Sequence, residues 1–220
     1  MNLNEFVPTH LEDATPVDVH STIYQVSGKF EKSNPDEITI REDIRYGVNK
    51  HLQLEAMVDN LSGGKEVRSG ESKFSILYMP YEVENSLPVL GLNPFVAFPT
   101  GKISEGIDPG AKIILTSKVT SETQLHLNYQ LRHNAGRRAQ ERAEETLYAF
   151  GVTRRLRDNL AIIADIIYQD DNTKSSFKNY VEAGLHQETY KGIYLSYGFG
   201  KGFGPNGPDW MGNLSLEVEI

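Results

Sequence analysis

The chain has 220 residues, of which 39% are hydrophobic, and a net charge of −8. It contains no cysteine, which excludes a disulfide framework and a cysteine-based metal site. The acidic balance argues against a nucleic-acid binder, which would show a basic stripe. No apolar run approaches the roughly 20 residues of a membrane helix. A strand that crosses a bilayer needs only about 10 residues, half of them polar, so a membrane barrel stays compatible with the mean hydropathy of −0.43.

The N-terminal residues 1–18 show no basic region followed by an apolar core, so no signal peptide is visible. The sequence is then either a mature form with a start methionine or a protein for which export is in question. From about residue 17 onward, alternation of apolar and polar residues predicts strands.

About a dozen strands are predicted, an even number that suits a bacterial barrel. The first is expected near 17–31, although its alternation is blurred around Ser21 to Tyr24. The others are expected at 37–47, 51–60, 72–81, 88–98, 110–119, 122–132, 145–154, 159–169, 176–187, 189–200 and 212–220. Outside the strands, loop residues 138–146 are compatible with one or two helical turns.

Short and long connections alternate along the chain. The short ones are 46–51, 119–123, 154–159 and 186–190. The long ones are 60–72, 99–110, 133–145, 170–176 and 201–211. In an up-and-down sheet this places short turns at one end and long loops at the other, as in outer-membrane barrels with their short periplasmic turns.

The last strand alternates strictly from Asn213 to Ile220 and runs to the final residue. We expect it to pair with the first strand and close the barrel, because an unpaired edge in lipid is prohibitively costly. The predicted fold is an all-β, up-and-down antiparallel transmembrane barrel. Residues 1–16 are expected to form a periplasmic extension and residues 17–220 the barrel.

Aromatic residues lie on the apolar phase, mostly near strand ends, as interfacial girdles would. They are Tyr46, Phe74, Tyr78, Phe98, Tyr129, Tyr168, Phe177, Tyr197 and Phe199. The alternative is that these are simply good strand residues. A soluble lipocalin-type barrel would alternate too, with its apolar face inside. Two residues, Glu42 and Asn179, fall on the predicted lipid face, where a bulge or an interfacial depth would accommodate them.

Four short motifs resemble one known family. They are LEDATPVD (11–18), FPTG (98–101), RRLRDNLAIIADI (154–166) and GFGPNGPDW (202–210). The family is the outer-membrane transporter family associated with the phenol-degradation meta pathway. The resemblance covers most of the chain from about residue 11 and implies an outer-membrane barrel that passes small or hydrophobic molecules. The terminal Ile220 departs from the aromatic residue usual in such barrels, which bears on recognition by the assembly machinery.

These observations predict a passive channel with a charged constriction that selects by size and charge. The expected pore-lining residues are Arg41, Arg45, Glu55, Arg132, Asp165 and Glu182. Arginines and acids on facing strands are expected to create a transverse field. Its solutes are expected to be small molecules, including hydrophobic or aromatic ones, and its other partners outer-membrane lipid and the assembly machinery. The alternative is a lumen filled by the same side chains, in a structural or adhesive protein that acts through its loops.

An outer-membrane hydrolase is a third possibility, with His126 or His186 beside Ser215, Asp165 or Glu182. No G-x-S-x-G or H-E-x-x-H motif occurs, which favours histidines in a polar network and a protein that is not an enzyme. The pattern G-x-G-x-x-G at 202–207 precedes a strand instead of a helix, so we interpret it as a loop. Asp170 and Asp171 lack the glycine-bearing calcium-loop pattern. We therefore expect no metal and no cofactor.

Overall fold

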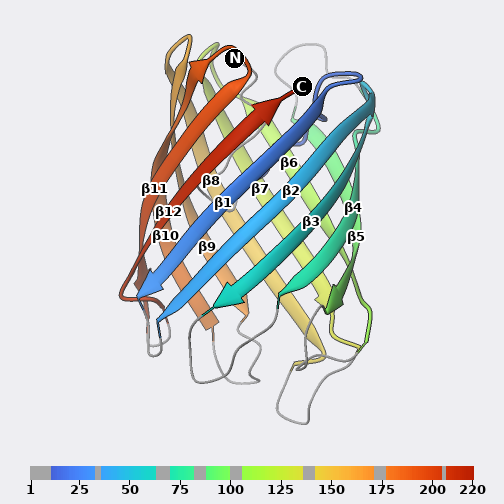
Figure 1. Cartoon of the computed structure of the whole chain (residues 1–220), viewed down its shortest axis with the longest axis vertical. Helices are drawn as coiled ribbons and strands as arrows, with labels where there is room; N and C mark the ends of the chain where they lie inside the picture. The colour runs from blue at the N-terminus through green and yellow to red at the C-terminus, as the bar shows by residue number, and fades with distance from the viewer. Residues whose placement is uncertain are drawn as a thin grey trace.

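The structure is a computed structural model that describes residues 11–32, 36–62, 70–81, 88–99, 106–135, 142–170, 177–204 and 207–220. These residues form twelve strands: β1 (Thr22–Lys32), β2 (Glu37–Asn49), β3 (Leu52–Ser62), β4 (Glu71–Tyr78), β5 (Val89–Pro99), β6 (Asp108–Lys118), β7 (Thr123–His133), β8 (Glu144–Arg157), β9 (Leu160–Asp170), β10 (Phe177–Tyr190), β11 (Ile193–Phe203) and β12 (Trp210–Glu219). Each strand pairs with its neighbours in the sequence, and together they close into one barrel (Figure 1). The predicted all-β antiparallel barrel is confirmed.

β1 and β12 close the barrel in antiparallel register, from the pair Ile23 and Glu219 to the pair Lys32 and Trp210. Backbone hydrogen bonds continue past the strand ends, because the N–H of Ile220 donates to the C=O of Thr22 at 2.8 Å. The predicted role of the last strand is confirmed. Closure leaves neither strand with an unpaired edge, which is the condition for a sheet inside a bilayer.

The predicted start of the first strand is wrong, since β1 begins at Thr22. The preceding residues make a turn, in which the N–H of Ser21 donates to the C=O of Asp18 at 3.0 Å and His20 has a positive φ of 65°. This turn explains why alternation is blurred there. The expected helical turns at 138–146 are also wrong from Glu144 onward, where β8 begins, while residues 136–141 lie outside the described residues.

Short connections follow β2, β6, β8 and β10, at residues 50–51, 119–122, 158–159 and 191–192. They lie at the end of the barrel that also holds the start of β1 and the C-terminal Ile220, the upper end in Figure 1. The longer connections lie at the opposite end, as the loop pattern predicted. Two connections depart from this pattern. Only residues 33–36 separate β1 from β2 at the long-loop end, and residues 79–88 separate β4 from β5 at the short-turn end.

The outer face of the barrel is apolar. Large hydrophobic side chains such as Ile40, Leu54 and Leu214 are exposed at alternate strand positions. Toward the long-loop end, outward-facing rings form pairs, including Phe30 with Trp210 at 5.0 Å and Tyr168 with Phe203 at 5.8 Å between ring centroids. An exposed apolar band bordered by aromatic rings is typical of a surface that faces lipid. A lipocalin-type barrel, with its apolar face inside, is contradicted.

The two polar residues on this face have simple explanations. Glu42 is exposed on β2, where the pairing with β1 and β3 continues without a register shift, so a bulge is not the reason. Instead, the phenol of Tyr24 on β1 donates to its carboxylate at 3.0 Å. Asn179 is opposite Tyr168 and Phe203, near the long-loop end of β10, and therefore at an interfacial depth.

Among the described residues, no helix is long and apolar enough to cross a membrane.

Candidate functional site: the barrel lumen

Residues 11–17 lie inside the barrel, in the part toward the short turns; we call them the lumen segment. Leu11, Ala14 and Val17 are almost fully buried. The N–H of Ala14 donates to Thr116 Oγ1 on β6 at 3.1 Å. The N–H of Val17 donates to Gln53 Oε1 on β3 at 2.9 Å. Backbone groups that would otherwise be unsatisfied are thus paired with inward-facing side chains.

Two glycines make room for this segment. A Cβ on Gly91 would meet Ala14 Cα at 3.1 Å, and a Cβ on Gly151 would meet Leu11 Cδ1 at 2.4 Å. Because Gly91 is on β5 and Gly151 on β8, the segment crosses the lumen from one wall to another. A Cβ at Gly91 would require its neighbours to shift by a few tenths of an ångström, and a Cβ at Gly151 would require the Leu11 side chain to move.

Leu11 packs into an apolar cluster on the β8–β12 side of the lumen. Its partners there are inward-facing and buried: Leu147, Ala149, Ala161, Ile163, Ile167, Tyr180 and Met211. The lumen is therefore filled by apolar side chains along this wall. The filled lumen given as an alternative in the sequence analysis was expected to be filled by polar side chains, whereas this cluster is apolar.

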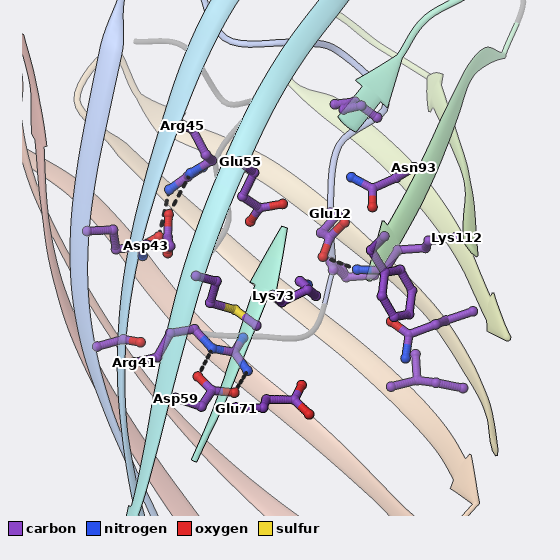
Figure 2. Close-up of a pocket in the computed structure, with 18 of the residues that line it drawn as sticks. Glu12, Arg41, Asp43, Arg45, Glu55, Asp59, Glu71, Lys73, Asn93 and Lys112 are labelled. Carbon is purple, nitrogen blue, oxygen red and sulfur yellow. Dashed lines mark hydrogen bonds and ion pairs between the residues drawn. The ribbon is translucent and has the colours of Figure 1, made fainter. Parts of the chain in front are cut away.

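Next to this cluster, and lined in part by its Leu11 and Leu147, lies a cavity of about 380 Å³, shown in Figure 2. Six cationic side chains line it, from Lys29, Arg41, Arg45, Lys73, Lys112 and Arg132. Seven acidic side chains line it, from Glu12, Asp13, Asp43, Glu55, Asp59, Glu71 and Glu145. A cavity with this lining is suited to small polar solutes.

Most of these charges are paired with near neighbours. Arg41 on β2 holds Asp59 on β3 with two hydrogen bonds, of 2.6 and 2.8 Å. Arg45 contacts Asp43 on the same strand at 2.9 Å and Glu217 on β12 at 3.1 Å. Opposite charges thus lie next to one another on the lumen wall, and the expected transverse field stays a prediction.

The lumen segment itself contributes charge. The carboxylate of Glu12 forms an ion pair with the ammonium of Lys112 on β6, and the C=O of Glu12 accepts a hydrogen bond from Asn128 Nδ2 at 3.3 Å. Asp13 is buried, and its Oδ1 accepts from the N–H of Thr15 at 2.9 Å. Burial raises the pKa of Asp13 to about 6.

Of the six residues predicted to line a pore, Arg41, Arg45, Glu55 and Arg132 line the cavity. Asp165 and Glu182 are opposite one another on β9 and β10, buried and pointing inward, but they do not line it.

Among the charged lining residues that the sequence interpretation missed are Lys73, Lys112 and Glu12. Both lysines lie on the polar phase of their strands, which was a usable signal. Glu12 precedes the strands and carries no periodic signal.

The two histidines singled out by sequence are buried among hydroxyl groups. His126 Nδ1 lies 3.1 Å from Thr116 Oγ1, and its Nε2 lies 3.2 Å from Thr153 Oγ1. His186 Nδ1 lies 2.7 Å from Ser196 Oγ, and its ring stacks on Tyr194. Through these contacts, both histidines belong to polar networks in the lumen wall.

The glycine-rich stretch 202–207 connects β11 to β12, with Gly204 in a turn conformation (φ 83°). No helix follows it, because β12 begins at Trp210, and residues 205–206 lie outside the described residues. Asp170 accepts hydrogen bonds from Thr146, while Asp171 is not among the described residues. Within the described ranges, no group of acidic or histidine side chains is placed to hold a metal ion.

A closed antiparallel barrel with an apolar, aromatic outer face and a charged interior defines the class of transmembrane β-barrels. The sequence matches no family model and no curated protein. Its structure is similar to an outer membrane channel from Pseudomonas putida F1, with a TM-score of 0.70, 12% identity and coverage of 98% of this chain and 100% of that one.

Two porins are also similar. NanC porin matches with a TM-score of 0.68, 9% identity and coverage of 90% of this chain and 100% of that one. KdgM porin, solved in complex with disordered oligogalacturonate, matches with a TM-score of 0.60, 11% identity and coverage of 91% and 98%. At such low identities, the likeness shows that this chain has the fold of these outer-membrane proteins.

Proposed function

We propose that this protein is a narrow passive channel for small solutes in a bacterial outer membrane. The observation that carries the proposal is the charged cavity inside a closed barrel whose outer face is apolar. Lipid would cover that outer face, and solutes would enter the cavity from the long-loop end. The similar fold of solved porins and channels supports the proposed channel function by analogy.

The lumen segment would act as the main restriction of this channel. It crosses the lumen from the β3 wall, where Val17 binds Gln53, to the β8 wall, where Leu11 packs against Gly151. A solute would have to pass beside it or displace it. Since the lining charges are largely paired with one another, the cavity presents alternating charges to a solute, and selection would depend on size and on the few uncommitted groups.

Reconstitution into planar bilayers tests this function. We expect the protein to require detergent, to change its SDS gel mobility on heating, and to produce small, discrete conductance steps. An absence of conductance from a correctly folded, heat-modifiable barrel would contradict the channel and leave a membrane barrel of another kind.

The motif resemblance extends the proposal to a family and a solute class. FPTG (98–101), RRLRDNLAIIADI (154–166) and GFGPNGPDW (202–210) support membership of the outer-membrane transporter family associated with the phenol-degradation meta pathway. Within that family, small hydrophobic or aromatic molecules would be the solutes. The likeness to the Pseudomonas putida F1 channel over 98% of this chain supports the extension at the level of fold.

A second candidate, a filled barrel with a structural or adhesive role, is favoured by one observation. The apolar cluster around Leu11, Ile163 and Tyr180 fills one side of the lumen. The same bilayer measurement separates the two, because a filled barrel would insert and remain electrically silent.

A further inference from the structure

Two lysines reach the cavity from strands that are not neighbours. Lys73 is on β4 and Lys112 on β6, with β5 between them. Lys112 is buried, and its ammonium binds the carboxylate of Glu12. The charges of the two lysines act on one another, so an anion between them would relieve their repulsion. The protein thus already holds one carboxylate in this part of the lumen.

Lys73 differs from the other cations of the cavity. The others form ion pairs: Lys29 with Glu31, Arg41 with Asp59, Arg45 with Asp43, Lys112 with Glu12, and Arg132 with Glu71. Within the described part of the chain, Lys73 has no ion pair. Its ammonium lies over the ring of Phe95, 5.5 Å from the centroid. Figure 2 shows it between the Arg41–Asp59 pair and the Glu12–Lys112 pair.

An apolar surface adjoins Lys73. Phe95, Met57 and Leu77 all line the same cavity. Met57 is directly opposite Lys73 in the β3–β4 pairing. A cation beside an apolar wall is complementary to an organic anion whose charged group meets the lysine while its body covers the wall.

We propose that Lys73, next to Lys112, binds the carboxylate of a small organic acid whose apolar body packs against Phe95 and Met57. This inference rests on the proposed channel function and names its solute class. Lys112 already binds a carboxylate, that of Glu12. A solute carboxylate can therefore compete with Glu12 for Lys112 and weaken the docking of the lumen segment.

Glu55 keeps this binding weak. It lines the same cavity from β3, where its carboxylate accepts a hydrogen bond from Ser75 Oγ and its charge interacts with that of Lys73. A second negative charge near the site lowers the affinity for an anion. Weak binding suits a channel, in which a solute must leave as readily as it enters.

Calorimetric titration of the full-length protein in detergent micelles tests the site with benzoate and its neutral analogue benzamide. We expect benzoate to bind and benzamide to bind at least ten times more weakly. For Lys73→Gln we expect the Kd of benzoate to rise about tenfold, the loss typical of one charge-assisted pair. Lys73→Arg should retain binding, and Glu55→Gln should tighten it. Lys118→Gln, at the short-turn rim, is the matched control and should bind as the wild type does.

Equal affinity for benzoate and benzamide, absence of benzoate binding, or wild-type binding by Lys73→Gln would overturn the inference. Bilayer conductance is measured separately on the same variants. Conductance without charge-dependent binding would overturn the carboxylate site and leave the channel standing. Charge-dependent binding without any conductance would support the site and contradict the channel.

Discussion

Arg132 on β7 and Glu71 on β4 form an ion pair of 2.8 Å, although β5 and β6 separate their strands in the barrel wall. The pair therefore crosses part of the lumen instead of following the barrel wall. Arg132 is also held by Asp108 on the adjacent β6 at 2.7 Å. Because Glu71 and Arg132 are at the strand ends nearest the long loops, their pair narrows the outer mouth of the cavity.

Removing the cross-lumen partner should widen that mouth. In Glu71→Gln, Arg132 keeps Asp108, so we expect the free energy of unfolding to change by no more than about 1 kcal/mol, as for other partly exposed pairs. Single-channel conductance should increase relative to the wild type. Lys32→Gln removes an exposed pair with Asp36 outside the lumen and is the matched control. Equal conductance in Glu71→Gln and the control would show that the Arg132–Glu71 pair does not narrow the cavity mouth.

Steric displacement of the lumen segment should also open the channel. A Cβ on Gly91 would meet Ala14 Cα at 3.1 Å and its O at 3.2 Å, so Gly91→Val should push the segment away. We expect larger conductance steps and faster proteolysis at the N-terminus. Gly28→Val is the control, because a Cβ there meets nothing within 4 Å. Unchanged conductance in Gly91→Val would mean that the segment does not limit passage.

Docking of the segment should weaken as the pH rises. In the docked state the pKa of Asp13 is raised by burial to about 6, from its ordinary value of 3.8, which is expected when the segment is displaced. Between these values the displaced carboxyl loses its proton while the docked one keeps it, so docking is strongest below both pKa values and loses stability up to about pH 6. The linkage predicts about tenfold weaker docking at pH 7 than at pH 5.

Conductance recorded at pH 5 and pH 7 measures this effect. The wild type should conduct more at pH 7. In Asp13→Asn, whose side chain cannot ionise, docking of the segment should not depend on pH in this range. Its conductance should therefore not increase between pH 5 and pH 7. A pH response of equal size in wild type and Asp13→Asn would assign the effect to other groups.

The wall should be least stable around β4. This strand spans only Glu71–Tyr78, and its ladder with β5 is interrupted between the pairs Ser75–Phe95 and Tyr78–Leu92. Pro94, which lies in the interrupted stretch, has no N–H to donate. We expect the amide of Ile76 to exchange its hydrogen faster than that of Ala164 in the continuous β9 ladder. Equal protection at the two positions would contradict a weak seam.

The sequence predicted the wall well because alternation is a local property of each strand. The clear periodicity of 122–132 and 213–220 corresponds to β7 and β12, with the expected face toward the lumen. Loop lengths predicted which strand ends lie together. The closing pair of β1 and β12 followed from the cost of an open edge in lipid.

The periodicity of the strands could not predict which residues fill the lumen. The ion pair of Glu12 and Lys112 joins residues 100 positions apart, and nothing in the periodicity of the lumen segment indicates where it docks. The apolar cluster left a partial signal, since residues 160–168 are apolar on both phases except at Asp165, which places Ile163 and Ile167 inside. Lys73 and Lys112 lie on the polar phase, but only the three-dimensional arrangement distinguishes a paired lysine from an uncommitted one.

A disulfide across the segment gives the most direct test. The N–H of Ala14 lies 3.1 Å from Thr116 Oγ1, and the sulfur of a cysteine at position 116 would occupy the place of this oxygen. The chain has no native cysteine that could form a competing disulfide. In Ala14→Cys/Thr116→Cys, oxidation should tether the segment to β6 and reduce bilayer conductance below that of the reduced protein. Adding a reductant should restore it, and neither single variant should respond. A conductance that is identical before and after reduction, with the disulfide verified by mass spectrometry, would contradict a channel restricted by its own lumen segment.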